Sequence, residues 1–241
     1  MKFAIVNKPS SSVSELVAKI RTEAKKRGFI EDQNEPEVVF SIGGDGTLLR
    51  AVRFGKPIVA FKAGRRSFLA DVEPDKVEDC LDRLKNSEYL IEDYSMLNVN
   101  GYDFFNDFAI MANNGKTITI NISSGEIEVE FEGDGVVIST QQGSTGWSLS
   151  ALGPYLGRGV DATVITLLNP ILAPVRSYVV NNYPIVARVK PIFHTGQART
   201  FVDGNIIGTV DEDTEILINR SNKRAKILRF YNERRKLTWT K

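Results

Sequence analysis

The sequence predicts two domains of different class, an α/β domain followed by an all-β domain. Residues 1 to about 95 alternate strand-like and helix-like patterns, whereas from about Tyr94 the chain changes to short runs of β-type residues. Strands separated by helices are typical of a parallel sheet covered by helices. We therefore expect a Rossmann-like α/β domain over residues 1–95, an all-β domain over 96–225, and a C-terminal strand and tail over 226–241 that belongs to either domain.

The elements of the first domain follow from the spacing of apolar residues. In chain order we expect a strand from Met1 to Asn7, an amphipathic helix at 12–27, a buried strand at 38–42, a helix at 48–53, a strand at 57–61 and a helix at 74–86. Pro74 stands near the start of its helix, where a missing N–H costs little. Ligands of parallel sheets bind at the carboxyl ends of strands. The turn after residues 38–42 is therefore a place where a site is expected.

The second domain is predicted as a succession of strands. They cover residues 118–122, 126–131, 135–139, 163–167, 184–189, 199–202 and 215–218, and a last strand at 225–230 belongs to either domain. Between Glu126 and Phe131, three glutamates alternate with three apolar residues, which indicates one buried and one solvated face rather than a metal site. A helical run is expected at 147–152. We find no internal repeat.

Composition excludes several classes of function. The 241 residues are 42% hydrophobic and 25% charged, with a net charge of +1, so there is no general electrostatic footprint for nucleic acid. The basic residues between Arg220 and Lys236 are interpreted as a solvated face. No apolar run is long enough to cross a membrane. The single cysteine, Cys80, is interpreted as a buried hydrophobic residue and excludes an intrachain disulfide, so we expect a cytoplasmic protein.

The turn Gly43-Gly44-Asp45-Gly46-Thr47 carries the strongest chemical signal. A glycine-rich turn between a strand and a helix lets backbone N–H groups approach phosphate oxygens. The carboxylate of Asp45 adds nothing to anion binding unless it takes a proton or holds a metal. The turn lacks the lysine of a Walker loop and the spacing of a dinucleotide fingerprint. We interpret it as a phosphate-handling loop with a built-in base.

A second polar cluster extends from Gly133 to Ser150. Asp134 suits sugar hydroxyls, the loop at 141–146 offers amides and hydroxyls, and Trp147 offers a flat face for a base. A purely structural turn-and-cap role is the alternative for this segment. In isolation, Asn106-Asp107 and Asp203-Gly204-Asn205 are turn signals.

Taken together, these motifs resemble those of the NAD kinases, in the same order and with similar spacing over nearly the whole chain. The Gly43–Thr47 turn alone is shared with diacylglycerol and sphingosine kinases. The second motif, with Gly143-Ser144-Thr145 leading into Ser148-Leu149-Ser150, is what distinguishes the NAD kinases. The resemblance implies a two-domain enzyme with its active site in the cleft between the domains. It also implies phosphoryl transfer from ATP or inorganic polyphosphate to the 2′-hydroxyl of the adenosine ribose of NAD, giving NADP.

The resemblance assigns roles residue by residue. Asp45 would be the general base, and the donor phosphates would lie against Gly43, Gly44, Gly46 and Thr47. Asp134 would lie on the nicotinamide side and residues 145–150 at the adenosine end. The residues implied to bind NAD are Asp45, Gly46, Arg50, Asn106, Asp107, Asp134, Thr145, Gly146, Trp147, Ser148, Leu149, Ser150 and Asn205. Family members use a divalent metal, usually magnesium, and are generally homodimers or homotetramers; we expect no nucleic-acid or membrane partner.

The chain departs from the family pattern at three places. The usual Asn-Glu pair is Asn106-Asp107, and the common Thr-Ala-Tyr is Thr145-Gly146-Trp147. Arg65 and Arg66 replace an apolar stretch, and they either serve donor phosphates or are solvated loop charges. His194 is interpreted as structural. The alternatives are a lipid kinase, a sugar-phosphate kinase and a non-catalytic NAD(P)-binding regulator, the last of which would be expected to lack Asp45.

Overall fold

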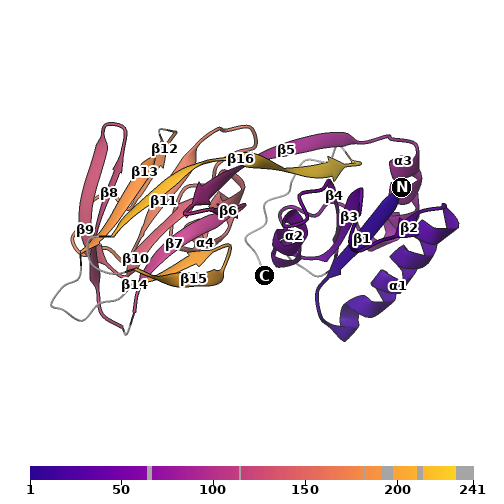
Figure 1. The fold of residues 1–241 in the computed structure, drawn as a ribbon, viewed down its shortest axis with the longest axis horizontal. Coiled ribbons are helices and arrows are strands. Elements are labelled where there is room, and N and C mark those ends of the chain that lie inside the picture. Colours follow the sequence, from indigo (N-terminus) through magenta and orange to yellow (C-terminus); the bar gives the residue numbers. More distant parts are fainter. Residues whose placement is uncertain (64–66, 114, 182, 191–197, 211–213, 232–241) are drawn as a thin grey trace. The chain divides into compact units, whose positions relative to one another are not determined.

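The protein folds into two compact units, shown as a ribbon in Figure 1. This computed structural model describes residues 1–63, 67–113, 115–181, 183–190, 198–210 and 214–231. Unit 1 consists of Met1–Tyr94 together with the chain from Arg224 onward, and unit 2 is Ser95–Lys223. Two strands run from one unit into the other, β5 (Leu90–Val99) and β16 (Glu215–Arg229).

Unit 1 is an α/β domain built on a parallel sheet. Its strands lie in the order β2-β1-β3-β4, followed by the end of β16, where Ile227 pairs in parallel with Ile58. The elements are β1 (Lys2–Asn7), α1 (Ser11–Lys26), β2 (Ile30–Glu31), β3 (Val38–Gly43), α2 (Asp45–Val52), β4 (Ile58–Lys62), a 3₁₀ turn (Pro74–Lys76) and α3 (Val77–Lys85). The four residues Phe3, Phe40, Ile42 and Phe61 of this sheet pack with α1 and α3 in one core.

Unit 2 is an antiparallel β domain with two sheets. Its strands and helical turns are β6 (Tyr102–Phe104), β7 (Asp107–Ala112), β8 (Ile118–Ser124), β9 (Ile127–Gly133), β10 (Gly135–Ser139), a 3₁₀ turn (Gln142–Thr145), α4 (Trp147–Ser150), β11 (Thr163–Leu168), β12 (Ser177–Val180), β13 (Ile185–Lys190), β14 (Ala198–Val202) and β15 (Asn205–Val210). One sheet has the order β12-β11-β10-β7-β14-β15, and the other contains the first part of β16 beside β13, β8 and β9. Apolar residues of both sheets, such as Phe108, Ile120 and Ile165, share one core.

The predicted fold class is confirmed, with corrections to several elements. The helix expected at 74–86 is a 3₁₀ turn over Pro74–Lys76 followed by α3, which ends at Lys85. The helix after the glycine turn begins at Asp45 rather than at residue 48, because an acidic residue in the first turn is favoured by the helix dipole. The strands expected at 215–218 and 225–230 are one strand, β16. The polar residues between them are mostly exposed and give no hydrophobic pattern. The helix at 147–152 ends at Ser150.

Two earlier interpretations are borne out by packing. Cys80 is fully buried in α3, and burial raises the pKa of its thiol far above the ordinary value. Along β9, Phe131 is buried and the glutamates between Ile127 and Phe131 are exposed. His194, Arg65, Arg66 and the basic residues at 234–236 lie outside the described residues.

Candidate active site

The glycine turn lies at the point where the connections of the parallel sheet diverge. From β1 the chain passes through α1 to β2 on one side, and from β3 it passes through α2 to β4 on the other. Figure 1 shows α1 and α2 on opposite faces of this sheet. Such a switch point leaves a crevice at the carboxyl ends of the two central strands. The glycine turn follows Gly43, the last residue of β3, and therefore lies at this crevice.

Gly43 and Gly46 differ in the space around them. A Cβ on Gly43 would lie 2.2 Å from the hydroxyl oxygen of Thr47, which is buried and packs over it. Among the described residues, a Cβ on Gly46 would meet no atom within 4 Å apart from its chain neighbours and the backbone of its own helix, and this residue is exposed. Gly43 and Thr47 therefore shape the turn, whereas the space over Gly46 is open to a ligand. The first backbone N–H groups of α2 have no partner within the helix and are suited to anions.

Asp45 is held by a loop that follows it by more than twenty residues. Its Oδ1 accepts hydrogen bonds from the Ser67 hydroxyl at 2.7 Å and from the Leu69 N–H at 3.1 Å, and its Oδ2 accepts one from the Phe68 N–H at 3.0 Å. A carboxylate offers about four acceptor positions. Three are filled and about one is left for a substrate hydroxyl, so the carboxylate is oriented before any substrate arrives. Sequence reasoning missed Ser67, because nothing in the local pattern marks it.

Arg50 places a cation beside the same edge of the sheet. Its Nη2 donates a hydrogen bond of 2.7 Å to the carbonyl oxygen of Asn7, the last residue of β1. The guanidinium group therefore lies at the carboxyl end of the strand next to β3, and Arg50 is an exposed residue. A role for Arg50 toward donor or acceptor charge stays a prediction.

In unit 2 the structure brings Asn106 and Asp107 together with the loop at 140–146. The Thr140 N–H donates to the Asn106 carbonyl at 2.9 Å. A Cβ on Gly143 would lie 1.9 Å from this same carbonyl oxygen, and a Cβ on Gly146 would lie 3.7 Å from Oδ2 of Asp107. The backbone of the second motif is thus packed directly on the Asn-Asp pair, and only glycine allows so close an approach at residue 143.

The Asp203 carboxylate orders this pair, a function that its turn signal did not reveal. It accepts hydrogen bonds from the backbone N–H groups of Phe105 at 2.9 Å, Asn106 at 2.7 Å and Asp107 at 3.2 Å. Asp203 has φ 47°, and with the following glycine it forms the two-residue turn between β14 and β15. The side-chain amide of Asn205, the residue after this turn, donates a hydrogen bond of 3.0 Å to the Asp203 carbonyl oxygen.

Asp107 is a buried carboxyl group with an unusual affinity for protons. Its residue is 6% exposed. Burial, reinforced by the negative charge of Asp203, raises its pKa from 3.8 to about 7. A carboxyl group that keeps its proton near neutral pH can donate a hydrogen bond as well as accept one. Asp107 can therefore offer either a donor or an acceptor to a polar ligand.

Of the remaining residues of the second motif, some have side chains that pack inside unit 2 and others are exposed to solvent. The Ser148 hydroxyl is fully buried and shares a hydrogen bond of 2.8 Å with Thr166. Trp147 packs edge-on against Phe201, with ring centroids 6.0 Å apart. The Thr145 hydroxyl donates to the Gln142 carbonyl, and Leu149 and Ser150 are half-buried and exposed. The side chain of Ser148 is therefore occupied by the fold, and any ligand contact there would come from other atoms of this segment.

Asp134 is not close to the other predicted residues of unit 2. It precedes β10, whose far end, Ser139, pairs with Asp107. Asp134 and Ser139 are five positions apart along an extended strand, which corresponds to about 17 Å. Its partner is Asn169, whose amide donates to the Asp134 carboxylate at 2.7 Å.

Comparison with known proteins shows the family to which this chain belongs. Residues 6–89 match the family model of the ATP-NAD kinase N-terminal domain, and residues 106–230 match that of the ATP-NAD kinase C-terminal domain. The chain is 40% identical over 235 residues to an NAD kinase of Saccharolobus solfataricus, covering 96% of this chain and 94% of that protein. The chain belongs to the NAD kinase family. An NAD kinase of Sulfurisphaera tokodaii is 38% identical over 239 residues, covering 96% of each chain.

Solved structures of NAD kinases have the same architecture. The crystal structure of an NAD kinase from Archaeoglobus fulgidus in complex with ATP has a TM-score of 0.79 and 25% identity, covering 97% of this chain and 94% of that one. A yeast NADH kinase complexed with NADH shares the fold, with a TM-score of 0.86 at 18% identity over 96% of this chain and 84% of its own. The predicted family and fold are thereby confirmed.

The described residues contain neither a ready-made metal site nor a membrane-spanning helix. Over these residues, no group of three or more histidine, cysteine, aspartate or glutamate side chains is arranged to hold a metal ion. Within the same ranges, none of the helices has the length and apolar character needed to span a membrane.

Proposed function

We propose that this protein transfers the γ-phosphoryl group of ATP to the 2′-hydroxyl of the adenosine ribose of NAD, giving NADP and ADP. The hydroxyl oxygen bonds to the γ-phosphorus, the bond from that phosphorus to the β,γ-bridging oxygen breaks, and the hydroxyl proton passes to Asp45. One observation carries this assignment beyond family membership. The Asp45 carboxylate is fixed by three hydrogen bonds beside the open space over Gly46, with about one acceptor position left.

The proposal assigns the donor phosphates to residues of unit 1 and the acceptor to residues of unit 2. In unit 1, Gly43, Gly44, Gly46 and Thr47 line the donor phosphates, because phosphoryl transfer depends on positioning and charge neutralisation. In unit 2, the pair Asn106-Asp107 and the segment 145–150 hold the acceptor, with Asp134 and Asn205 as further contacts. Functional domain limits of 1–95, 96–225 and 226–241 stay a prediction.

A divalent metal fits the donor set of this site in one specific way. Mg²⁺ is commonly held by one or two carboxylates together with substrate phosphates and water, rather than by a cage of protein ligands. Asp45 has about one acceptor position left, which the proposed reaction gives to the substrate hydroxyl, and the described residues add no three-carboxylate cluster. A metal here would therefore be held mainly by phosphate oxygens and water. When bound, the metal would offset charge on the transferring phosphoryl group. Inorganic polyphosphate as a second donor is open to the same assay.

The proposal extends to the assembly and the location of the protein. Unit 2 exposes large apolar side chains, including Leu152 at 77% and Leu172 at 97% exposure, and such surfaces favour self-association into a homodimer or homotetramer. A reducing, cytoplasmic environment suits a single buried thiol. The lipid-kinase and regulator alternatives are not favoured, because both NAD kinase domains match and the chain keeps Asp45.

The decisive test is a magnesium-dependent assay with NAD and ATP, in which an NADP-specific dehydrogenase detects the product. Asp45→Asn should lower kcat about 100- to 10,000-fold, the contribution of a general base, with KM values for ATP and NAD within a few fold. The variant keeps one side-chain oxygen for the Ser67 loop and should stay folded. Asp75→Asn, at an exposed carboxylate of the same unit, is the matched control and should retain full activity. Absence of NADP from folded wild-type protein, or an Asp45→Asn variant with near-normal kcat, would contradict the assignment.

A further inference from the structure

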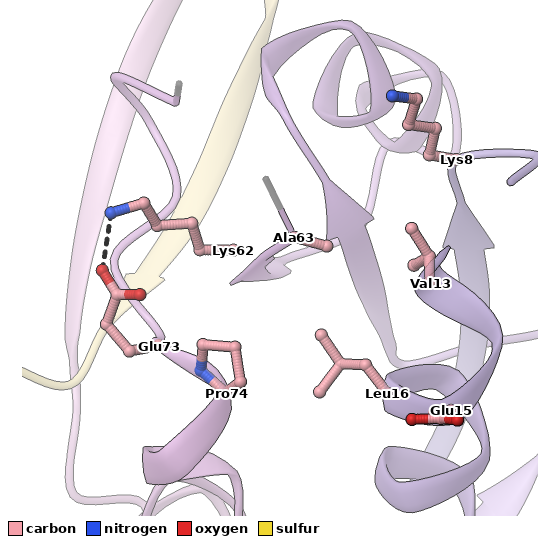
Figure 2. A pocket seen from close by; sticks show the side chains of 8 residues that line it. All are labelled: Lys8, Val13, Glu15, Leu16, Lys62, Ala63, Glu73 and Pro74. Carbon is pink, nitrogen blue, oxygen red and sulfur yellow. Dashed lines mark hydrogen bonds and ion pairs between the residues drawn. The ribbon is translucent and has the colours of Figure 1, made fainter. Parts of the chain in front are cut away.

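The segment that contacts Asp45, residues 67–72, is tied to the sheet of unit 1 by bonds of its own. The N–H of its last residue, Val72, donates to the Ala60 carbonyl at 3.2 Å, and its carbonyl oxygen accepts 2.8 Å from the N–H of Lys62. Glu73, the next residue, pairs with the ammonium group of Lys62 at 2.6 Å, an ion pair that Figure 2 shows. One end of the segment is therefore fixed to β4.

A buried arginine fixes the middle of the same segment. Nη1 of Arg229 donates to the Leu69 carbonyl oxygen at 2.5 Å and to Oδ1 of Asp71 at 3.2 Å. Both Arg229 and Leu69 are buried, so these bonds are shielded from water. The bonds to Arg229 and to β4 do not involve Asp45. The segment is therefore held in place independently of the carboxylate that it contacts, as a preorganised site requires.

The hydroxyl group of Ser67 has its direction fixed by a second bond. Its Oγ accepts a hydrogen bond of 3.0 Å from the Ala70 N–H and donates one of 2.7 Å to Oδ1 of Asp45. A serine hydroxyl has a single proton to donate. Because a backbone N–H cannot accept that proton, the proton of Ser67 is directed at the Asp45 carboxylate.

The hydrogen bonds to Asp45 are distributed unequally between its two oxygens. Oδ1 accepts from the Ser67 hydroxyl and the Leu69 N–H. Among the described residues, Oδ2 accepts only from the Phe68 N–H. Each carboxylate oxygen offers about two acceptor positions. The open position is therefore on Oδ2, and turning the carboxylate out of this orientation would break the charge-assisted bond to Ser67.

We propose that Ser67 is a positioning residue for Asp45, whose hydroxyl holds Oδ1 so that Oδ2 receives the proton of the acceptor hydroxyl. This inference rests on the proposed function and names the atom of the base that takes the proton. As the bond from the 2′-oxygen to the γ-phosphorus forms and the bond to the β,γ-bridging oxygen breaks, the proton moves from the 2′-oxygen to Oδ2. Oδ1 then becomes the carbonyl oxygen of the acid and still accepts from Ser67 and Leu69. Ser67 keeps its own proton throughout.

Removal of this hydroxyl should slow the chemical step and leave substrate binding unchanged. Ser67→Ala should lower kcat about 10- to 100-fold, because a slightly misplaced catalytic group costs up to this much, with KM for NAD and ATP within about twofold. Ser67→Thr keeps the donor and should recover kcat to within about threefold of wild type. Thr22→Val, which removes an exposed hydroxyl of α1 in the same unit, is the matched control and should keep full kcat. NADP formation at saturating NAD and ATP measures all three.

A double-mutant cycle separates positioning from a general structural role. In an Asp45→Ala background the hydroxyl has no carboxylate to hold, so Ser67→Ala should lower the single-turnover rate by less than about twofold further. A residue that only supported the fold would lower the rate by the same factor in both backgrounds. Thermal unfolding checks that each variant is folded. If Ser67→Ala fails to fold, Ser67→Cys, a weaker donor, takes its place with the same expected loss.

The outcomes separate this inference from the proposed function. Near-normal kcat in Ser67→Ala, together with a large loss in Asp45→Ala, would overturn the inference and leave the proposed function standing. An equal loss from Ser67→Ala with and without the Asp45 carboxylate would also overturn it. Near-normal kcat in Asp45→Ala would contradict the proposed function, and the inference with it. A loss in Ser67→Ala that Ser67→Thr restores, and that disappears in the Asp45→Ala background, would support both.

Discussion

Replacing Asp107 by asparagine should change how the stability of unit 2 depends on pH. In the folded protein the pKa of this buried carboxyl group is raised from 3.8 to about 7. The folded state therefore binds the proton more tightly than the unfolded chain, and wild-type stability falls as pH rises from about 4 to about 7. A shift of about three pKa units corresponds to about 4 kcal/mol in the free energy of unfolding. Asparagine keeps the shape without titrating, so the variant should lack this loss.

The measurement is urea unfolding at several pH values between about 4 and 8. A Trp239→Phe background leaves Trp147 as the single tryptophan, so its fluorescence reports on unit 2. The wild-type free energy of unfolding should decline with pH relative to Asp107→Asn, by up to about 4 kcal/mol across this range. Glu126→Gln, at an exposed glutamate of the same unit, should keep the wild-type slope. Parallel curves for wild type and Asp107→Asn would refute the assignment of a raised pKa to this residue.

Three further substitutions test contacts that the structure identifies. Asp203→Ala removes the acceptor of three backbone N–H groups and should destabilise unit 2 by about 2 kcal/mol or more and raise KM for NAD, whereas Asp203→Asn should recover most of both. Gly143→Ala forces a Cβ against the Asn106 carbonyl and should cost about 1–3 kcal/mol by urea unfolding, while Gly157→Ala, with open space, should stay within about 0.5 kcal/mol. Arg229→Met breaks buried ion pairs in unit 1 and should lower its stability by about 3–5 kcal/mol, measured by thermal or urea unfolding.

The fold was predictable where local pattern and burial agree. The apolar run at 38–42, followed by glycines, predicted β3 and its turn because every residue of that strand is buried. The strands β5, β6, β7, β12 and β15 were not predicted. β12 and β15 each have a single buried residue and so show no regular apolar face. β7 is buried over residues 107–110, but the sequence Asn106-Asp107 at its start was interpreted as a turn signal. The continuous path of β16 was missed for a related reason. Its polar middle is paired by backbone hydrogen bonds, which leave no trace in the side-chain pattern.

The site was predictable only as far as it is local in sequence. Asp45 within its glycine turn forms a motif of five consecutive residues, and a motif of that kind can be recognised without a structure. The partners that orient the site come from elsewhere, since Ser67 follows Asp45 by 22 residues and Asp203 is 97 residues from Asn106. A two-residue turn is sufficient to explain Asp203-Gly204 in the sequence. Nothing else in the sequence indicates that the Asp203 carboxylate binds the backbone of residues 105–107.

These long-range contacts give the C-terminal strand a part in the chemistry of Asp45. Arg229, at the end of β16, donates through Nη1 to the Leu69 carbonyl at 2.5 Å and through Nε to Glu92 at 2.6 Å. The N–H of that same Leu69 donates to the Asp45 carboxylate. Arg229 is only 8% exposed, so its hydrogen bonds are shielded from water. They hold the loop of residues 67–69 on the side away from Asp45. The return of the chain into unit 1 therefore orients the residue proposed as the base, and a chain that ended before β16 would lose that orientation together with the strand.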